Sequence, residues 1–171
     1  LANCAVESGS GSKPLEQYDG GDIFEYFREY EIGDKAKQLG NTQEGDGAKY
    51  RGAGAIQVTG RDAYTRFSEY TGDPKILEDG ALYVGKEYFW EAAGYYWSVY
   101  KPGDGFDFNG TCDEMAEMVE EAETEGEVEA VLAEKFHEIV GMINSGTKEH
   151  TREADRRDYY DYYLNLLKEN G

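Results

Sequence analysis

The chain has 171 residues, which is enough for one domain with a hydrophobic core of its own. Its 36 acidic and 17 basic residues give a net charge of −19, so we expect neither nucleic acid nor an anionic membrane as a partner. No stretch approaches the roughly 18 apolar residues that span a bilayer, and no signal-peptide pattern opens the chain.

The N-terminal part of the chain predicts two helices joined by a loop. Residues 1–8 resemble the last turns of a helix whose start is missing, and the Gly- and Ser-rich residues 8–21 predict the loop. Asp22 can cap a second helix over residues 22–30. Helical spacing places three apolar residues of that helix on one inward face: Ile23, Phe24 and Phe27.

A glycine-rich segment follows at residues 39–60. Its glycines permit tight turns and close backbone approach, and its polar residues offer hydrogen bonds rather than a core. After Gly54, residues 55–59 predict a short strand or extended run that ends at Gly60. Such a segment can form one wall of a binding cleft, and a solvated surface loop is the alternative.

The middle of the chain predicts two more helices. Residues 61–74 fit a helix that is stopped at Gly72 and Pro74. Residues 81–100 fit a long apolar helix that is broken or thinned at Gly85 and Gly94.

The last third of the chain is also helical in pattern. Residues 101–110 predict a turn-rich connection, and apolar residues recur at helical spacing from 113 to 144, with Gly126 separating two helices. A last helix is expected at about 151–169. We therefore predict one mostly helical domain over 1–171, with at most a small hairpin or sheet.

Metal chemistry finds little support in the sequence. Residues 104–114 alternate like a calcium loop, but Gly105 and Ala116 stand where the EF-hand pattern needs acids. His137 and His150 lie thirteen positions apart without a Cys or third His nearby. We expect no metal site and no cofactor.

Carboxylate chemistry remains, although most of the 36 acids must be ordinary surface residues. Glu7 ends an apolar helix and precedes a flexible Ser-Gly run, which is where a general acid can lie at the edge of a cleft. A helix-terminal glutamate facing water is the alternative. Cys4 and Cys112 make no disulfide framework, and we expect them to remain thiols.

The stretch "LGNTQEGDGAKYRGAGAIQVTGRDAY" (39–64) resembles the signature of family 19 glycoside hydrolases, especially the bacterial and phage endolysin branch. This resemblance implies a lysozyme-like helical fold with two lobes, and a cleft between an N-terminal lobe and the helices after residue 80. Other segments resemble that family in the same order: "CAVESG" (4–9), "YFWEAAGYYW" (88–97), "MINSGT" (142–147) and "ADRRDYY" (154–160).

The resemblance also implies roles for individual residues. Glu7 matches the general acid, and Thr59 matches the hydroxyl residue that holds the attacking water. Glu31, in a Tyr-Glu pair, matches the second carboxylate, although a longer segment than usual separates it from Leu39. Glu16 is the rival, because endolysins of this type can use an acid about nine residues after the first.

Further matches concern the sugar cleft. Gln57, Asn144 and Arg156 correspond to residues that line or brace it, and Tyr50 is expected to stack on a sugar. The chain departs from the family pattern at two positions: Val6 stands where a His is frequent, and Ala53 stands where an Arg is frequent. Few residues precede the general acid, so we expect a processed piece or a minimal form.

The activity implied is inverting hydrolysis of β-1,4 links between N-acetylated amino sugars, without a cofactor. Peptidoglycan is the favoured substrate and chitin the alternative, although the acidic charge argues mildly against an anionic cell wall. We expect a monomer that acts on the cell wall, either outside the cell or after release from the host cytoplasm. An inactive glycan-binding domain of a phage tail or wall protein, and a structural part of a larger machine, are alternatives from other classes.

Overall fold

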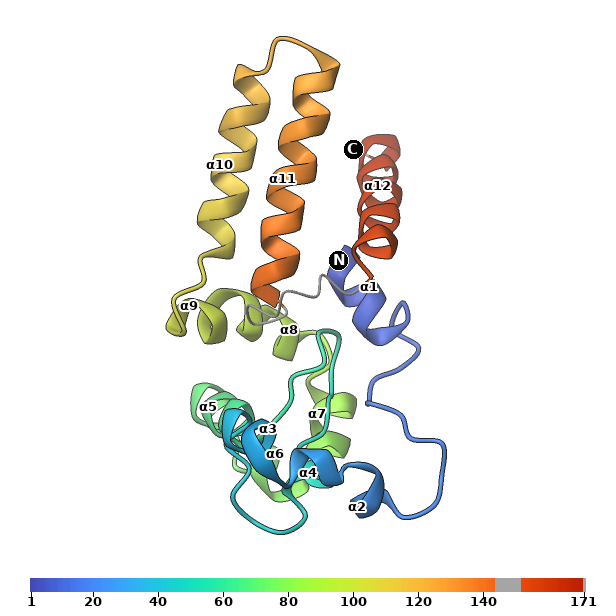
Figure 1. The fold of residues 1–171 in the computed structure, drawn as a ribbon, viewed down its shortest axis with the longest axis vertical. Helices are drawn as coiled ribbons and strands as arrows, with labels where there is room; N and C mark the ends of the chain where they lie inside the picture. The colour runs from blue at the N-terminus through green and yellow to red at the C-terminus, as the bar shows by residue number, and fades with distance from the viewer. Residues whose placement is uncertain (144–151, 171) are drawn as a thin grey trace. The chain divides into compact units, whose positions relative to one another are not determined.

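The structure is a computed structural model, and it describes residues 1–143 and 152–170 (Figure 1). The chain divides into two compact units. One is Glu7–Tyr96, and the other, which we call the terminal unit, combines Leu1–Val6 with Trp97–Gly171. The predicted mostly helical class is confirmed and is consistent with a lysozyme-like fold. The expectation of one catalytic domain over 1–171, with a cleft between lobes, stays a prediction.

The Glu7–Tyr96 unit consists of short helices and turns. It begins with the end of α1, and its other elements follow in chain order. Their bounds are α1 (Ala2–Ser8), α2 (Ile23–Tyr26), the 3₁₀ helix η1 (Arg28–Tyr30), α3 (Gly33–Gln38), α4 (Asp46–Lys49), α5 (Arg61–Thr71), α6 (Lys75–Asp79), α7 (Ala81–Glu87) and α8 (Glu91–Tyr95).

The second helix starts as predicted but buries a different face. The Asp22 side chain accepts hydrogen bonds from the backbone N–H groups of Phe24 and Glu25, as an N-cap does. Phe27 is buried at 2% exposure and packs with Tyr30 of η1. Phe24 is 59% exposed, so the prediction that it faces inward was wrong. Because α2 is only four residues long and continues as a 3₁₀ turn, helical periodicity does not hold across it.

Residues 55–59 do not form the predicted strand. Residues 54–57 form a turn that begins at Gly54, whose φ of 78° favours glycine. Ala53 and Val58, which flank this turn, form an isolated antiparallel bridge, and Ala53 forms a second one with Leu15. In the described part of the chain these bridges are the nearest approach to the small sheet that we expected.

The helix predicted at 61–74 is confirmed as α5, which ends at Gly72 with φ of 72°. The apolar segment 81–100 does break into pieces, but the break falls at residues 88–90 rather than at Gly85. Gly85 lies inside α7, where an added Cβ would come within 2.8 Å of the Pro14 carbonyl and the Leu15 side chain. This glycine therefore serves close packing.

The described part of the terminal unit contains three long helices. Its elements are the π-helix η2 (Tyr96–Tyr100), α9 (Lys101–Gly103), α10 (Phe108–Glu121), α11 (Glu125–Ile143) and α12 (Glu153–Asn170). α10 and α11 run side by side (Figure 1). They separate at residues 122–124 and not at Gly126, which lies inside α11, because Glu127 caps that helix by accepting the backbone N–H groups of Glu123 and Thr124. Cys4 and Cys112 are not joined in a disulfide.

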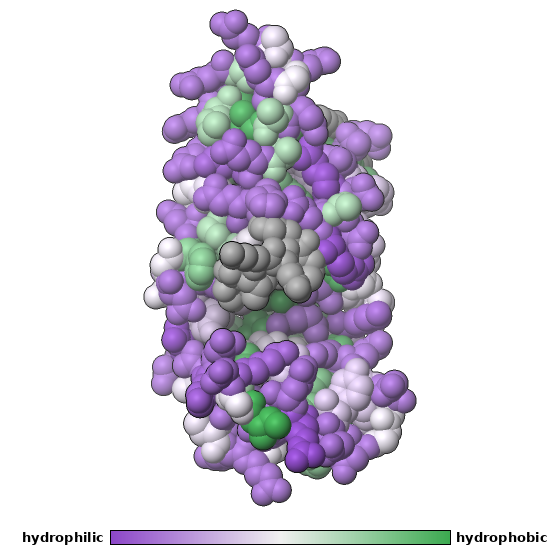
Figure 2. Space-filling view, viewed as in Figure 1, coloured by the Kyte–Doolittle hydropathy of each residue, from purple (hydrophilic) through white to green (hydrophobic). Residues whose placement is uncertain are grey.

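Hydrophilic residues cover most of the face shown in Figure 2, as expected for a chain of net charge −19. Hydrophobic residues are scattered between them. Among the residues that the structure describes, no helix combines the length and the apolar character needed to cross a bilayer.

Gly80 joins α6 to α7 with φ of 64°, and an added Cβ would overlap the Lys49 carbonyl. We expect Gly80→Ala to destabilise the fold by about 1–3 kcal/mol, because it combines a strained backbone with a backbone clash. Urea unfolding followed by circular dichroism measures this loss. The control is Gly72→Ala, which has a similar φ of 72° but nothing within 4 Å of the added Cβ. If both variants lose the same free energy of unfolding, the contact with Lys49 does not contribute to the loss.

Candidate active site

One pocket of the Glu7–Tyr96 unit, with a volume of about 480 Å³, collects four of the predicted site residues: Glu7, Glu16, Gln57 and Thr59. Lys13 and Tyr30 also line it. Leu15 and Gln17 complete the lining, so the pocket contains two carboxylates, two amides, two hydroxyl groups and one ammonium group. This composition suits recognition and acid–base hydrolysis of a polyhydroxylated ligand.

Glu7 reaches this pocket from the last turn of α1. Ala5 and Val6, just before it, are buried, and the Glu7 side chain is half-buried. The chain turns back directly afterwards, because the Ser8 carbonyl accepts the Lys13 N–H at 2.8 Å. The helix end and this turn together fix where the Glu7 carboxyl enters the pocket.

Glu16 is held by hydrogen bonds to both of its carboxylate oxygens. The Tyr30 hydroxyl donates to Oε1 at 2.8 Å, and the Gly52 N–H donates to Oε2 at 2.9 Å. Burial and the nearby Glu16 charge raise the pKa of Tyr30 well above its ordinary value, so Tyr30 stays protonated and remains a donor. Both donors satisfy the charged form of Glu16 and fix its orientation.

Gly52 allows its backbone to approach the side chains of the pocket closely. An added Cβ would come within 2.8 Å of the Gln57 amide oxygen and 3.2 Å of Glu16 Oε2. The glycine-rich segment therefore brings its backbone directly against the two side chains that define the pocket wall.

Thr59 and Gln57 come from the turn after Gly54. The Thr59 hydroxyl donates to the Gln57 carbonyl at 2.8 Å, which leaves its oxygen lone pairs to accept a hydrogen bond from water. The Gln57 side-chain amide donates to the Gly54 carbonyl at 2.9 Å and to the Lys13 carbonyl at 3.4 Å. These bonds fix both side chains at the pocket.

Glu31 does not line this pocket. Its carboxylate accepts the N–H groups of Gly47 at 2.7 Å and Gly45 at 3.2 Å, and it borders a different pocket of about 530 Å³. These bonds tie the end of η1 to the start of α4. The structure thus brings Glu16, and not Glu31, into the same pocket as Glu7.

Tyr50 cannot take the stacking role that we expected. It is 1% exposed, its hydroxyl donates to the Leu77 carbonyl at 3.1 Å, and its ring lies 5.1 Å from that of Tyr64. A ring buried on both faces offers no surface to a sugar. The resemblance matched the residue type, but it could not distinguish an aromatic residue that faces the cleft from one that supports its wall.

The remaining predicted residues lie elsewhere. Arg156 belongs to the terminal unit, where it is 2% exposed and donates to Asn3 Oδ1 of α1 at 2.9 Å. This bond braces the helix whose last turn carries Glu7. Asn144 lies outside the described residues.

Three polar residues of the pocket were missed as functional candidates: Lys13, Gln17 and Tyr30. Tyr30 was noted only as the neighbour of Glu31, although an aromatic residue that ends a helical segment near acids is a signal for a buried donor. Lys13, in a Gly- and Ser-rich loop, carries no signal in the sequence. Within the described residues there is no group of three or more His, Cys, Asp or Glu side chains that could hold a metal ion.

No protein-family model and no solved structure matches the chain. Part of the chain is similar to a Haemophilus influenzae protein named "Glycosyl hydrolase family 19 domain-containing protein", with 41% identity over 68 residues. The matched part is 39% of this chain and 33% of that protein, so the chain spans about a third of its relative's length. This partial similarity relates the chain to a protein with a glycoside hydrolase name.

Proposed function

We propose that the protein is a glycoside hydrolase that inverts the anomeric centre as it cleaves β-1,4 links between N-acetylated amino sugars. Glu7 protonates the leaving oxygen, Glu16 takes a proton from the attacking water, and Thr59 holds that water. The observation that carries the proposal is the shared pocket of Glu7, Glu16 and Thr59. The partial similarity to a protein with a family 19 name supports the same reaction class.

The surroundings of the two carboxyl groups differ. Glu16 accepts hydrogen bonds on both oxygens, which suits a charged base of fixed orientation. Glu7 reaches the pocket from the last turn of α1, and its side chain is half-buried. An inverting reaction needs the two carboxyl groups roughly 6.5–9.5 Å apart, which leaves room for the water between the base and the anomeric carbon.

Glu31 remains the alternative base, and substitution separates the two candidates. We expect Glu16→Gln to lower the hydrolysis rate ~10²-fold or more, because the water loses its base. We expect Glu31→Gln to lower the rate less than about tenfold but to reduce the melting temperature, because one of the two glycine N–H groups loses its acceptor. Reducing-end release and thermal unfolding measure the two effects.

In the same assay we expect Thr59→Ala to lower the hydrolysis rate less than Glu16→Gln does, since it misplaces the water without removing either carboxyl. If Glu31→Gln instead abolishes turnover in a protein that is still folded, and Glu16→Gln does not, then Glu31 is the base.

Purified peptidoglycan and colloidal chitin, assayed side by side, identify the substrate. We propose peptidoglycan as the substrate, met at the cell wall, with chitin as the alternative. NMR of the first product formed distinguishes inversion from retention. Binding of either glycan without any cleavage would favour the glycan-binding domain instead.

A further inference from the structure

A second pocket of the Glu7–Tyr96 unit contains a buried guanidinium group without an acidic partner. Arg51 is 8% exposed and makes no ion pair with any described residue, in a chain that carries 36 acids. Its Nη1 donates to the Ala48 carbonyl at 2.6 Å. Its Nε is buried and has no hydrogen-bond partner among the described residues.

A buried charge without a counter-ion is costly, so such groups are normally paired or bind an anion. The Phe27 ring, 5.9 Å from the Arg51 guanidinium carbon, offers only a weak cation–π contact. Arg61 of the same pocket shows the ordinary solution, since it pairs with Asp46 through two nitrogens and also donates to Gln43. Among the described residues, Arg51 is therefore a buried cation of this pocket without an acidic partner.

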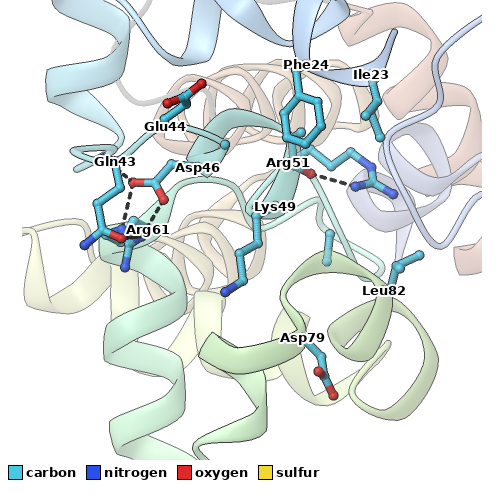
Figure 3. Close-up of a pocket in the computed structure, with 13 residues that line it drawn as sticks. Ile23, Phe24, Gln43, Glu44, Asp46, Lys49, Arg51, Arg61, Asp79 and Leu82 are labelled. Atoms are coloured by element: carbon cyan, nitrogen blue, oxygen red, sulfur yellow. Dashed lines mark hydrogen bonds and ion pairs between the residues drawn. The ribbon is translucent and has the colours of Figure 1, made fainter. Parts of the chain in front are cut away.

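The pocket beside Arg51 has a volume of about 430 Å³ and a mixed lining (Figure 3). In Figure 3 the Arg51 guanidinium and the Asp46–Arg61 pair lie on opposite sides of Lys49. Lys49 is exposed and adds a second positive charge, whereas Glu44 and Asp79 add negative ones. Phe24 and Leu82 contribute apolar surface and are 59% and 63% exposed.

We propose that this pocket binds a carboxylate of a short peptide with small apolar side chains, of the kind that peptidoglycan carries on its glycan strands. A carboxylate suits the positive charge of the Arg51 guanidinium, with Lys49 as a second donor. The exposed Phe24 and Leu82 suit methyl groups. The negative charges of Glu44 and Asp79 disfavour a polyanion and suit a ligand that also carries an amine.

This inference rests on the proposed function and deepens it, because chitin has no carboxylate to occupy the pocket. The two pockets are linked through the chain. Gly52 follows Arg51 directly and donates its N–H to Glu16. A peptide held beside Arg51 would therefore bind one residue away from the group that anchors the proposed base.

Calorimetric titration of the full chain with the peptide L-Ala-γ-D-Glu-L-Lys tests the assignment without any turnover. Its fully amidated form, chitotetraose, acetate and inorganic phosphate are titrated in parallel. We expect saturable binding of the peptide and at least about tenfold weaker binding of the amidated form, because charge-assisted hydrogen bonds are lost.

Arg51→Gln and Lys49→Gln should each weaken peptide binding, Arg51→Gln by about tenfold or more. Lys49→Gln keeps the test valid if Arg51→Gln fails to fold, since Lys49 is exposed. The control is Lys37→Gln on α3, whose ammonium group pairs with an exposed aspartate, and it should bind as the wild type does.

Three results would overturn the proposal: no saturable peptide binding, equal binding of the amidated form, or variants that bind like the control. Acetate or phosphate binding as tightly as the peptide would also overturn it, since the pocket would then hold an adventitious anion only. A protein that binds the peptide but cleaves no glycan refutes the proposed function and leaves this pocket assigned.

Discussion

Glu7→Gln is expected to abolish glycan hydrolysis while the protein stays folded. Glutamine keeps the shape and hydrogen-bonding capacity of the side chain but has no proton to transfer to the leaving oxygen. General-acid assistance contributes ~10²–10⁴-fold in rate, so the remaining turnover should be at most about a hundredth of the wild-type value. Reducing-end release from the cleaved glycan gives the rate, and thermal unfolding should show little change, because a helix end tolerates glutamine.

Glu69→Gln is the matched control for this experiment. Glu69 lies on α5 of the same unit and is exposed. It should retain a near-normal rate. If Glu7→Gln keeps more than about a tenth of the wild-type turnover on every glycan cleaved, the proton comes from another group and the assignment of Glu7 fails.

Asp46→Asn should have the largest effect on stability. Asp46 has a side-chain exposure of 2% and accepts four hydrogen bonds: two from Arg61 and one each from the backbone N–H groups of Thr42 and Gln43. Asparagine removes the charge and places an amide donor against these donors. Breaking one side of a buried ion pair costs about 3–5 kcal/mol in free energy of unfolding. Urea unfolding at neutral pH measures the loss.

The effect of Asp46→Asn should also depend on pH. Burial favours the neutral form of Asp46, but the hydrogen bonds from Arg61, Gln43 and Thr42 outweigh it and hold the pKa below the ordinary 3.8. A lowered pKa stabilises the fold above the unfolded-state value, and this stabilisation disappears as the pH falls through the folded-state value. The difference between wild type and variant should therefore be full above about pH 5 and shrink below pH 4.

Asp62→Asn, also involving α5, is the control. Asp62 pairs with Arg66, and both side chains are 44% exposed, so the loss should be below about 1 kcal/mol. An Asp46→Asn loss no larger than this would show that the ion pair and its backbone bonds contribute little to the fold.

Local sequence signals predicted where helices end better than they predicted which residues are buried. Asp22 and Gly72 act where the sequence placed them, because capping and left-handed termination depend on neighbouring backbone groups. The exposure of Phe24 follows from the shortness of α2, across which helical periodicity does not hold, whereas the burial of Gly85 depends on which distant segment packs there. Gly85 contacts the loop at Pro14 and Leu15, some seventy positions earlier in the chain.

The glycine-rich segment explains both the success and the limits of the site prediction. Its polar residues were expected to offer hydrogen bonds, and many of these bonds go to other groups of the protein rather than to a ligand. Asn41, for example, donates to the Tyr30 carbonyl and accepts from the Arg61 N–H. The pattern indicated a wall but not which side faces the pocket, so Thr59 and Gln57 lie on the pocket while Tyr50 supports the wall from within.

The bond between Asn3 and Arg156 has a consequence for the order of folding during synthesis. The two residues are 153 positions apart, and their helices belong to the same compact unit. A ribosome releases the Glu7–Tyr96 unit well before α12, at about 5–20 residues per second. The bond between Asn3 and Arg156 can therefore form only after α12 has been synthesised. The turn that follows Glu7, closed by the bond from the Lys13 N–H to the Ser8 carbonyl, can by contrast form early, so the two ends of α1 should gain their contacts at different times during synthesis.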